Sequence, residues 1–188
     1  MNGDIIMTGK ITHVRGNVCE PLLFDDNEVP IIPHCCNNLG QMGKGVALSI
    51  RQKWPGAYTY YKKGVMQLGA ISAWVEFTQE DDPPLRTPTV CIFNMIGQDG
   101  VVSQDNPKPV KYWALAKAMM TMACKIDAYR ISFPDNKFVI HCPKFGSDLA
   151  GGNWDFIFEL IKEIWVENRW DVVIYEFEPD KDKWGIIE

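Results

Sequence analysis

The stretch "IIPHCCNNLGQMGKGVALSI", residues 31–50, decides how this chain can be interpreted. An apolar run ends at His34 and two adjacent cysteines, and glycines then follow at positions 40, 43 and 45. A helical pattern begins directly behind them. Glycine lets the backbone come close to a ligand and adopt positive φ, and the free N–H groups of a helix N-terminus attract anions. The stretch predicts a strand, a glycine-rich loop and a helix.

The composition predicts one globular domain. The chain has 188 residues, of which 46% are hydrophobic and 23% charged, enough to bury a sizeable core. Its net charge of -5 argues against a protein held to nucleic acid by a broad basic surface. The six cysteines lie mostly in apolar segments, no signal peptide precedes them, and no apolar stretch is long enough to span a bilayer. We expect buried, reduced thiols in a cytoplasmic protein.

Strands and helices alternate along the chain. Apolar runs predict strands over 10–16, 29–36, 73–79, 89–97, 137–142 and 171–177. Helical periodicity predicts helices over 45–54, 109–126 and 152–168, with a short helix or turn over 56–64. The helix over 152–168 is expected to bury Trp154, Ile157, Leu160, Ile161 and Ile164. This order predicts a largely parallel sheet between helical layers, which binds ligands at the carboxyl ends of its strands.

Two glycine-rich loops lie at such strand ends, residues 40–45 and 144–152. Side by side they could hold a diphosphate from both sides, although each could also be a plain strand-to-helix turn. The spacing excludes a nucleotide-hydrolysing P-loop. Only two residues separate Gly40 from Gly43, and Lys44 is followed by Gly45 rather than by a hydroxyl residue.

The dipeptide His-Cys occurs twice, at His34 and at His141. Neighbouring strand residues point to opposite faces, so neither pair can close on one ion, and we expect no metal and no other cofactor. A cysteine nucleophile with His34 or His141 as its base is a further interpretation. Core packing is the more usual role of cysteines in apolar strands.

Four segments in order carry a family resemblance: "ITHVRGNV", "PHCCNNLGQMGKGVALSI", "FNMIGQ" and "CPKFGSDLAGGNWDFI". They resemble the macro domains, which bind ADP-ribose, and within them the branch that processes ADP-ribose-1''-phosphate. The resemblance implies an α/β fold with three layers, α/β/α, around a central mixed, largely parallel sheet. It implies a single macro domain over 1–188, with a core of about 9–178 and short extensions at both ends.

The resemblance also implies ligand-binding residues. The adenine amine would lie against Asn17 and the backbone of Val18. The adenine ring would lie against Tyr175, with Phe177 as the alternative; core packing is the other interpretation of both aromatics and the preferred one for Phe177. Asn37 would bind the distal ribose hydroxyls, or else cap its own loop. The diphosphate would lie between two sets of residues: Gly43, Lys44, Gly45 and Val46 on one side, and Gly146, Ser147, Asp148 and Leu149 on the other.

For the chemistry, the resemblance favours His34 as the group that activates water, with Asp148 or Asp99 orienting it. A core histidine with a satisfied ring is the alternative. Ala150 stands where lysine-dependent relatives have an aspartate, which argues against their mechanism. Pro33 cannot donate a ladder hydrogen bond and suggests an irregular strand beside His34.

The function expected from these residues is hydrolysis of ADP-ribose-1''-phosphate to ADP-ribose and phosphate by a cytoplasmic, monomeric phosphatase without a cofactor. The first alternative is a non-catalytic ADP-ribose reader. The second is a hydrolase that removes ADP-ribose from modified proteins or nucleic acid ends. The expected partners are ADP-ribose or its 1''-phosphate and, for the alternatives, ADP-ribosylated macromolecules, with no membrane.

Overall fold

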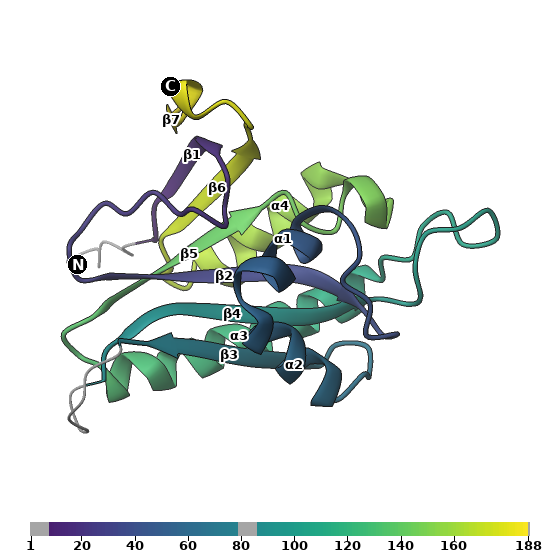
Figure 1. The fold of residues 1–188 in the computed structure, drawn as a ribbon, viewed down its shortest axis with the longest axis horizontal. Helices are drawn as coiled ribbons and strands as arrows, with labels where there is room; N and C mark the ends of the chain where they lie inside the picture. The colour runs from purple at the N-terminus through teal and green to yellow at the C-terminus, as the bar shows by residue number, and fades with distance from the viewer. Residues whose placement is uncertain (1–7, 79–85, 188) are drawn as a thin grey trace, which may run out of the picture.

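The computed structural model describes residues 8–78 and 86–187. The strands are β1 (Ile11–Gly16), β2 (Glu28–Asn37), β3 (Ile71–Phe77), β4 (Pro88–Gln98), β5 (Lys137–Pro143), β6 (Val172–Phe177) and β7 (Gly185–Ile186). The helices are α1 (Gly45–Lys53), α2 (Pro55–Lys63), α3 (Tyr112–Ser132) and α4 (Trp154–Ile161) (Figure 1). Two 3₁₀ turns (Asp148–Ala150 and Lys181–Lys183) and a π turn (Lys162–Val166) join them.

All strands join one sheet in the order β3-β4-β2-β5-β6-β1-β7. The inner pairs are parallel, and β3 and β7 are antiparallel at the two edges. The mixed, largely parallel sheet that the sequence predicts is therefore confirmed. The segment 171–177 does not form the last strand in space, because β1 and then β7 lie beyond it. Gln79, the end of one predicted strand, lies outside the described residues.

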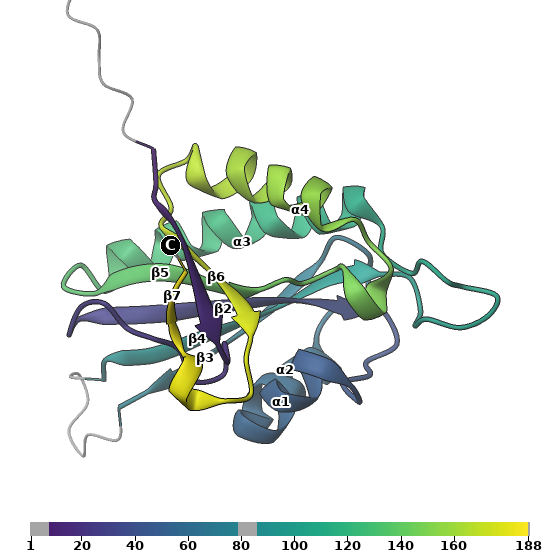
Figure 2. The same cartoon turned by 90° about the horizontal axis from the view of Figure 1, so that it is seen from above.

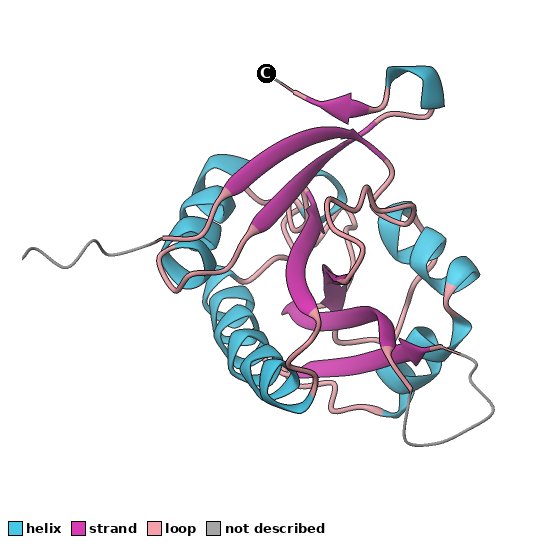
Figure 3. Cartoon of the chain, turned by 90° about the vertical axis from the view of Figure 1, so that its left-hand side faces the viewer, coloured by secondary structure: helices cyan, strands magenta, loops and turns pink. Residues whose placement is uncertain are grey.

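Helices cover both faces of the sheet. Figure 2 shows α3 and α4 on one face and α1 and α2 on the other, and Figure 3 shows the twisted sheet between them. One core cluster includes Leu115 and Trp165, and a second includes Ile50 and Trp54. All of β2 is buried, which explains the apolar run from Val29 to Pro33. Within the described ranges, no helix has the length and apolar character needed to cross a membrane.

The helix that follows the second glycine loop departs from the predicted periodicity. After Ile161 the α-helix becomes a π turn, which shifts the register of the side chains. Trp165 is consequently fully buried, whereas Ile164, the residue that a regular helix would bury, is only half-buried. The predicted burial of Ile157 and Ile161 is confirmed, whereas Trp154, Leu160 and Ile164 are only partly buried, so those predictions were wrong.

Strands β2 and β5 separate towards their carboxyl ends. Their pairing ends at Ile31 and Ile140, while β2 stays in register with β4 through Pro33 as far as Cys36. Pro33 has no N–H to donate. The irregularity expected there is the loss of pairing with β5, while the register with β4 does not shift at Pro33. The chain leaves β2 towards α1 on one face and leaves β5 towards α4 on the other. Such a switch point is where open α/β sheets bind ligands.

Candidate functional site

The two glycine loops meet at this switch point. We call residues 38–46 and 144–153 together the loop junction. A Cβ atom built on Gly45 would lie 3.5 Å from Leu149 Cδ1, so the second loop reaches the start of α1. A Cβ on Gly43 would meet no atom within 4 Å. The structure thus brings the two predicted phosphate loops together and leaves the backbone at Gly43 open to solvent.

The first loop presents the N-terminus of α1. Gly40 and Gly45 have φ values of 72° and 55°, a region that favours glycine. Lys44 is the N-cap residue, and its side chain makes no capping hydrogen bond. The first N–H groups of α1 therefore have no side-chain acceptor from the N-cap, and with the helix dipole they favour an anion there.

The second loop is folded tightly on itself. A Cβ on Gly152 would lie 2.2 Å from the carbonyl oxygen of Gly146. Asp148 has a φ of 24°, unusual for a residue other than glycine, and its side chain is exposed. Ser147 Oγ donates to the carbonyl of Lys144 at 2.9 Å, which orients that hydroxyl towards its own loop. The exposed carboxylate of this loop is that of Asp148.

Asn37 shapes the first loop with its side chain. Its Oδ1 accepts from the N–H groups of Leu39 at 3.0 Å and Gln41 at 3.1 Å, and its Nδ2 donates to the Gln41 carbonyl at 2.8 Å. The hydroxyl of Tyr61 also donates to Asn37. These bonds favour the loop-capping role that the sequence left open over direct contact with a ribose.

His34 lies inside the molecule with no exposed surface. Its Nε2 is 2.7 Å from Asn94 Oδ1, and Asn94 Nδ2 donates to Ser72 Oγ at 3.0 Å and to the Ala57 carbonyl at 3.2 Å. Since the Asn94 oxygen must accept, His34 carries its proton on Nε2. Burial lowers the pKa of His34 to about 4, so the ring is neutral. This geometry favours the core histidine over the water-activating base.

The predicted carboxylates lie elsewhere. Asp99 is exposed at the end of β4, where its Oδ1 accepts from Asn38 Nδ2 at 3.0 Å. Asp148 is exposed in the second loop. Within the described chain, the polar side chains that contact the His34 ring belong to Asn94 and Cys36, and neither aspartate is among them. The structure therefore does not assemble a His34–aspartate pair.

The cysteines on β2 are buried. Cys36 Sγ lies 3.5 Å from His34 Nδ1, so a thiol and an imidazole do meet. Burial nevertheless raises the pKa of Cys36 well above its usual value and that of Cys35 to about 12, which keeps both thiols protonated. Five of the six cysteines are buried, as predicted, and Cys124 is exposed. The geometry favours core packing over a cysteine nucleophile.

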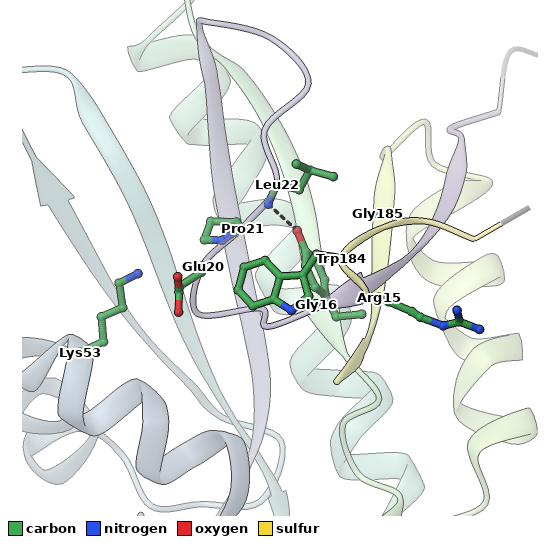
Figure 4. A pocket seen from close by; sticks show the side chains of 9 residues that line it. Arg15, Gly16, Glu20, Pro21, Leu22, Lys53, Trp184 and Gly185 are labelled. Atoms are coloured by element: carbon green, nitrogen blue, oxygen red, sulfur yellow. Dashed lines mark hydrogen bonds between the residues drawn. The ribbon is translucent and has the colours of Figure 1, made fainter. Parts of the chain in front are cut away.

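A pocket of about 520 Å³ also lies at the carboxyl ends of the strands, beside β1 and β6 (Figure 4). Gly16, Tyr175 and Trp184 line it. Asn17 and Val18 follow Gly16 directly, and Asn17 Oδ1 accepts from the Cys19 N–H at 3.0 Å. Of the residues expected near adenine, Tyr175 lines this pocket, and Asn17 and Val18 lie in the chain directly after Gly16 at its wall. Its volume is in the range of small-molecule sites.

Phe177 is not a core residue. Its side chain is 74% exposed at the end of β6, so the preferred core-packing interpretation was wrong. Strand residues two apart point to the same face, and Tyr175, two residues earlier, is buried against the second core cluster. The buried part of β6 ends at Tyr175, and Phe177, the last residue of the strand, lies beyond it.

Beneath the pocket lies a buried polar chain. The Tyr175 hydroxyl accepts from the Leu22 N–H at 2.8 Å and lies 2.9 Å from His141 Nδ1. His141 Nε2 is 2.7 Å from Glu28 Oε1. These contacts fix the β1–β2 loop to β5 and β6. Hydrogen bonding of this kind is what a buried carboxylate requires.

Three residues of the site were not identified from the sequence: Asn94 beside His34, and Glu28 and Trp184 at the pocket. Asn94 interrupts an apolar strand, a signal that could have been found, because a polar side chain there needs a buried partner. Glu28 directly precedes an apolar run and reads as a loop residue. Trp184 follows a charged segment, and no local pattern links it to β1.

Comparisons with known proteins bear on the fold. No model of a known protein family matches the sequence. A macrodomain protein from Streptomyces coelicolor has a similar structure, with a TM-score of 0.60 and 30% identity, covering 89% of this chain and 99% of that one. An ADP-ribose 1''-phosphate phosphatase from Aspergillus clavatus is 37% identical over 54 residues, 29% of this chain.

A DNA ADP-ribosyl glycohydrolase from Thermus aquaticus is 27% identical over 170 residues, which cover 88% of this chain. The chain spans 25% of the length of the Aspergillus protein and 40% of the Thermus protein. The sequence similarity to the glycohydrolase thus extends over most of this chain, whereas the similarity to the phosphatase is confined to one segment.

Proposed function

Because this chain belongs to the macro domain family, we propose that it binds ADP-ribose and hydrolyses a bond at the distal ribose of an ADP-ribose derivative. The loop junction carries this proposal. It places an open glycine backbone and an uncapped helix N-terminus where β2 and β5 part, which suits a diphosphate. The pocket beside β1 lies at the same edge and suits the adenosine half.

In this proposal the main chain from Gly43 to Val46 and from Gly146 to Leu149 holds the diphosphate. Asn17, Val18 and Tyr175 hold the adenine. Asn37 keeps the first loop in shape, and His34 supports β2 from beneath as a neutral group.

Hydrolysis needs an accessible group that can orient water, and the exposed carboxylates of Asp148 and Asp99 meet this condition. We assign this role to Asp148 first, because it belongs to the loop junction itself.

The finer reaction we propose is removal of the 1''-phosphate from ADP-ribose-1''-phosphate. Water attacks phosphorus, the bond between phosphorus and the ribose oxygen breaks, and that oxygen leaves as a hydroxyl group. Phosphorus NMR of this compound mixed with the protein in chelator tests it, and we expect an inorganic phosphate signal to grow. Asp148→Asn should slow that growth by about 10²-fold or more. If the diphosphate resonances shift without phosphate appearing, the protein is a reader or acts on another adduct.

A second candidate is removal of ADP-ribose from nucleic acid. Between Glu28 and Glu76 the chain has no acidic residue, although its net charge is -5. The same segment contains five basic residues: Lys44, Arg51, Lys53, Lys62 and Lys63. In the described ranges 8–78 and 86–187, none of them takes part in an ion pair, unlike several lysines elsewhere. A phosphate backbone would complement this side of the loop junction.

Charge reversal tests this candidate. Arg51→Glu/Lys63→Glu should slow release of ADP-ribose from a modified DNA strand by about 10-fold or more, and should flatten its salt dependence. Binding of free ADP-ribose should change little. Lys117→Glu/Lys125→Glu, on the opposite helical layer, is the matched control. Equal effects of the two double variants would contradict the proposal that the basic residues of α1 and α2 bind the nucleic acid.

A further inference from the structure

The pocket beside β1 is completed by the segment that follows β6. We call residues 178–187 the strap. It is tied to the sheet at both ends, because the Glu178 N–H donates to the Gly16 carbonyl at 3.1 Å and the Ile187 N–H donates to the His13 carbonyl at 2.8 Å. Between these points β7 pairs with β1, with Gly185 opposite Arg15. The strap is therefore a fixed wall of the pocket.

Trp184 is the side chain that the strap presents to the pocket (Figure 4). Its Nε1–H donates to the Glu178 carbonyl at 2.7 Å, which fixes the orientation of the indole. The ring lies beside Gly16: a Cβ there would be 3.6 Å from Trp184 Cδ2 and 3.7 Å from Tyr175 Cε1. Gly16 is thus a bare piece of backbone between two aromatic rings.

The strap is also joined to the opposite wall of the pocket. The Lys181 ammonium pairs with the Glu20 carboxylate, and the same ammonium lies 5.1 Å from the centroid of a Trp184 ring. Glu20 belongs to the β1–β2 loop, which lines the pocket together with Leu22. The pKa of Glu20 is lowered, first of all by its hydrogen bond to Lys181. This ion pair connects two segments far apart in the sequence across the rim.

A half-buried indole held in one orientation against a pocket of about 520 Å³ suits a flat aromatic ligand. Indole rings bind bases through stacking, which is tolerant of base identity. We propose that Trp184 stacks on the purine base of the bound ligand and that the strap completes the base pocket. This inference rests on the proposed function, which supplies the purine in the form of ADP-ribose.

Titration calorimetry with two ligands tests the inference. ADP-ribose carries the base, whereas ribose 5-phosphate does not. We expect Trp184→Ala to weaken ADP-ribose binding about 10- to 100-fold and to leave the weak binding of ribose 5-phosphate unchanged. Trp184→Phe should retain most of the affinity, because it keeps a stacking ring. Trp113→Ala removes an exposed tryptophan on α3 and is the matched control.

The possible failures are distinguishable. If wild-type protein binds no ADP-ribose, the proposed function fails. If it binds and Trp184→Ala binds equally well, only the base-stacking inference is overturned. Tighter binding by Trp184→Ala would also overturn it, since the indole would then occupy the place of the base. Should Trp184→Ala unfold, Trp184→Leu against Trp184→Phe replaces it, and equal affinities would contradict stacking.

Discussion

Two regions lie at the carboxyl ends of the strands, the loop junction and the pocket beside β1, and different kinds of groups form their surfaces. At the loop junction glycine backbone is exposed at Gly43, Gly45 and Gly151, and the side chains beneath it, His34 and Asn94, are neutral and buried. At the pocket beside β1 the surface consists of side chains, Tyr175 and Trp184, and the group beneath is a carboxylate, Glu28, facing His141. The loop junction suits a charged group held by the main chain, and the pocket suits a ring held by side chains.

The largest effect should come from a charge at the loop junction. Gly43→Glu adds a carboxylate where a Cβ meets no neighbour, so the fold should tolerate it. Repulsion of the diphosphate should weaken ADP-ribose binding about 100-fold or more in calorimetry. Gly43→Gln, of equal size without charge, should lose much less. Equal losses of affinity for the two variants would show that the size of the side chain, and not its charge, weakens binding. The loop junction would then not be a site for a charged group.

The next effect concerns stability with pH. Burial lowers the pKa of His34 from 6.5 to about 4, so below pH 6.5 the unfolded chain takes up a proton that the folded chain does not. The contribution of His34 to stability is therefore complete above pH 6.5 and falls by roughly 3 kcal/mol as the pH drops to about 4. Denaturant unfolding at several pH values should show this slope.

His34→Gln should reduce that slope and should keep turnover within about 10-fold of wild type, because His34 does not contact the ligand. If the variant keeps its stability but loses more than about 100-fold in turnover, His34 takes part in the hydrolysis.

At the pocket end, Tyr175→Phe removes the hydroxyl between the Leu22 N–H and His141. The part-buried Leu22 N–H and the buried His141 Nδ1 then lose this partner, and the free energy of unfolding should fall by about 1–3 kcal/mol. The aromatic ring remains, so ADP-ribose affinity should fall only a few-fold. Unchanged stability in thermal unfolding would show that the polar chain beneath the pocket has little weight.

The smallest effect should come from the rim. Lys181→Met breaks an ion pair between two exposed side chains, a kind that contributes little to stability because solvent screens it. ADP-ribose affinity should change less than about 3-fold at physiological salt. A 10-fold loss would mean that the ion pair, rather than the β7 pairing, holds the strap in place.

Local patterns in the sequence predict most of the fold. The period of each strand and helix is set by the face it buries, which is why β2, α1 and β5 could be located closely. The π turn after Ile161 could not, because it depends on how Trp165 packs against α3. The strap could not either, since its place is decided by contacts with β1, more than 160 positions earlier in the chain.

The site was predictable to the extent that it is made of backbone. Glycines mark where a loop approaches a ligand, so both halves of the loop junction could be found. Side-chain roles depend on what lies beneath the loops: His34 bonds to Asn94 and Asn37 bonds to its own loop, and neither bond is visible in the sequence. The net charge of the whole chain likewise gives no sign that the segment containing α1 and α2 has no acidic residue.

We infer that one ligand spans both the loop junction and the pocket beside β1. Proton–nitrogen NMR of the labelled protein during an ADP-ribose titration tests this inference. The amide signals of Gly43, Gly45 and Gly146 and the indole signal of Trp184 should shift together, with one dissociation constant. Shifts confined to one of these two regions, or different constants for them, would contradict it.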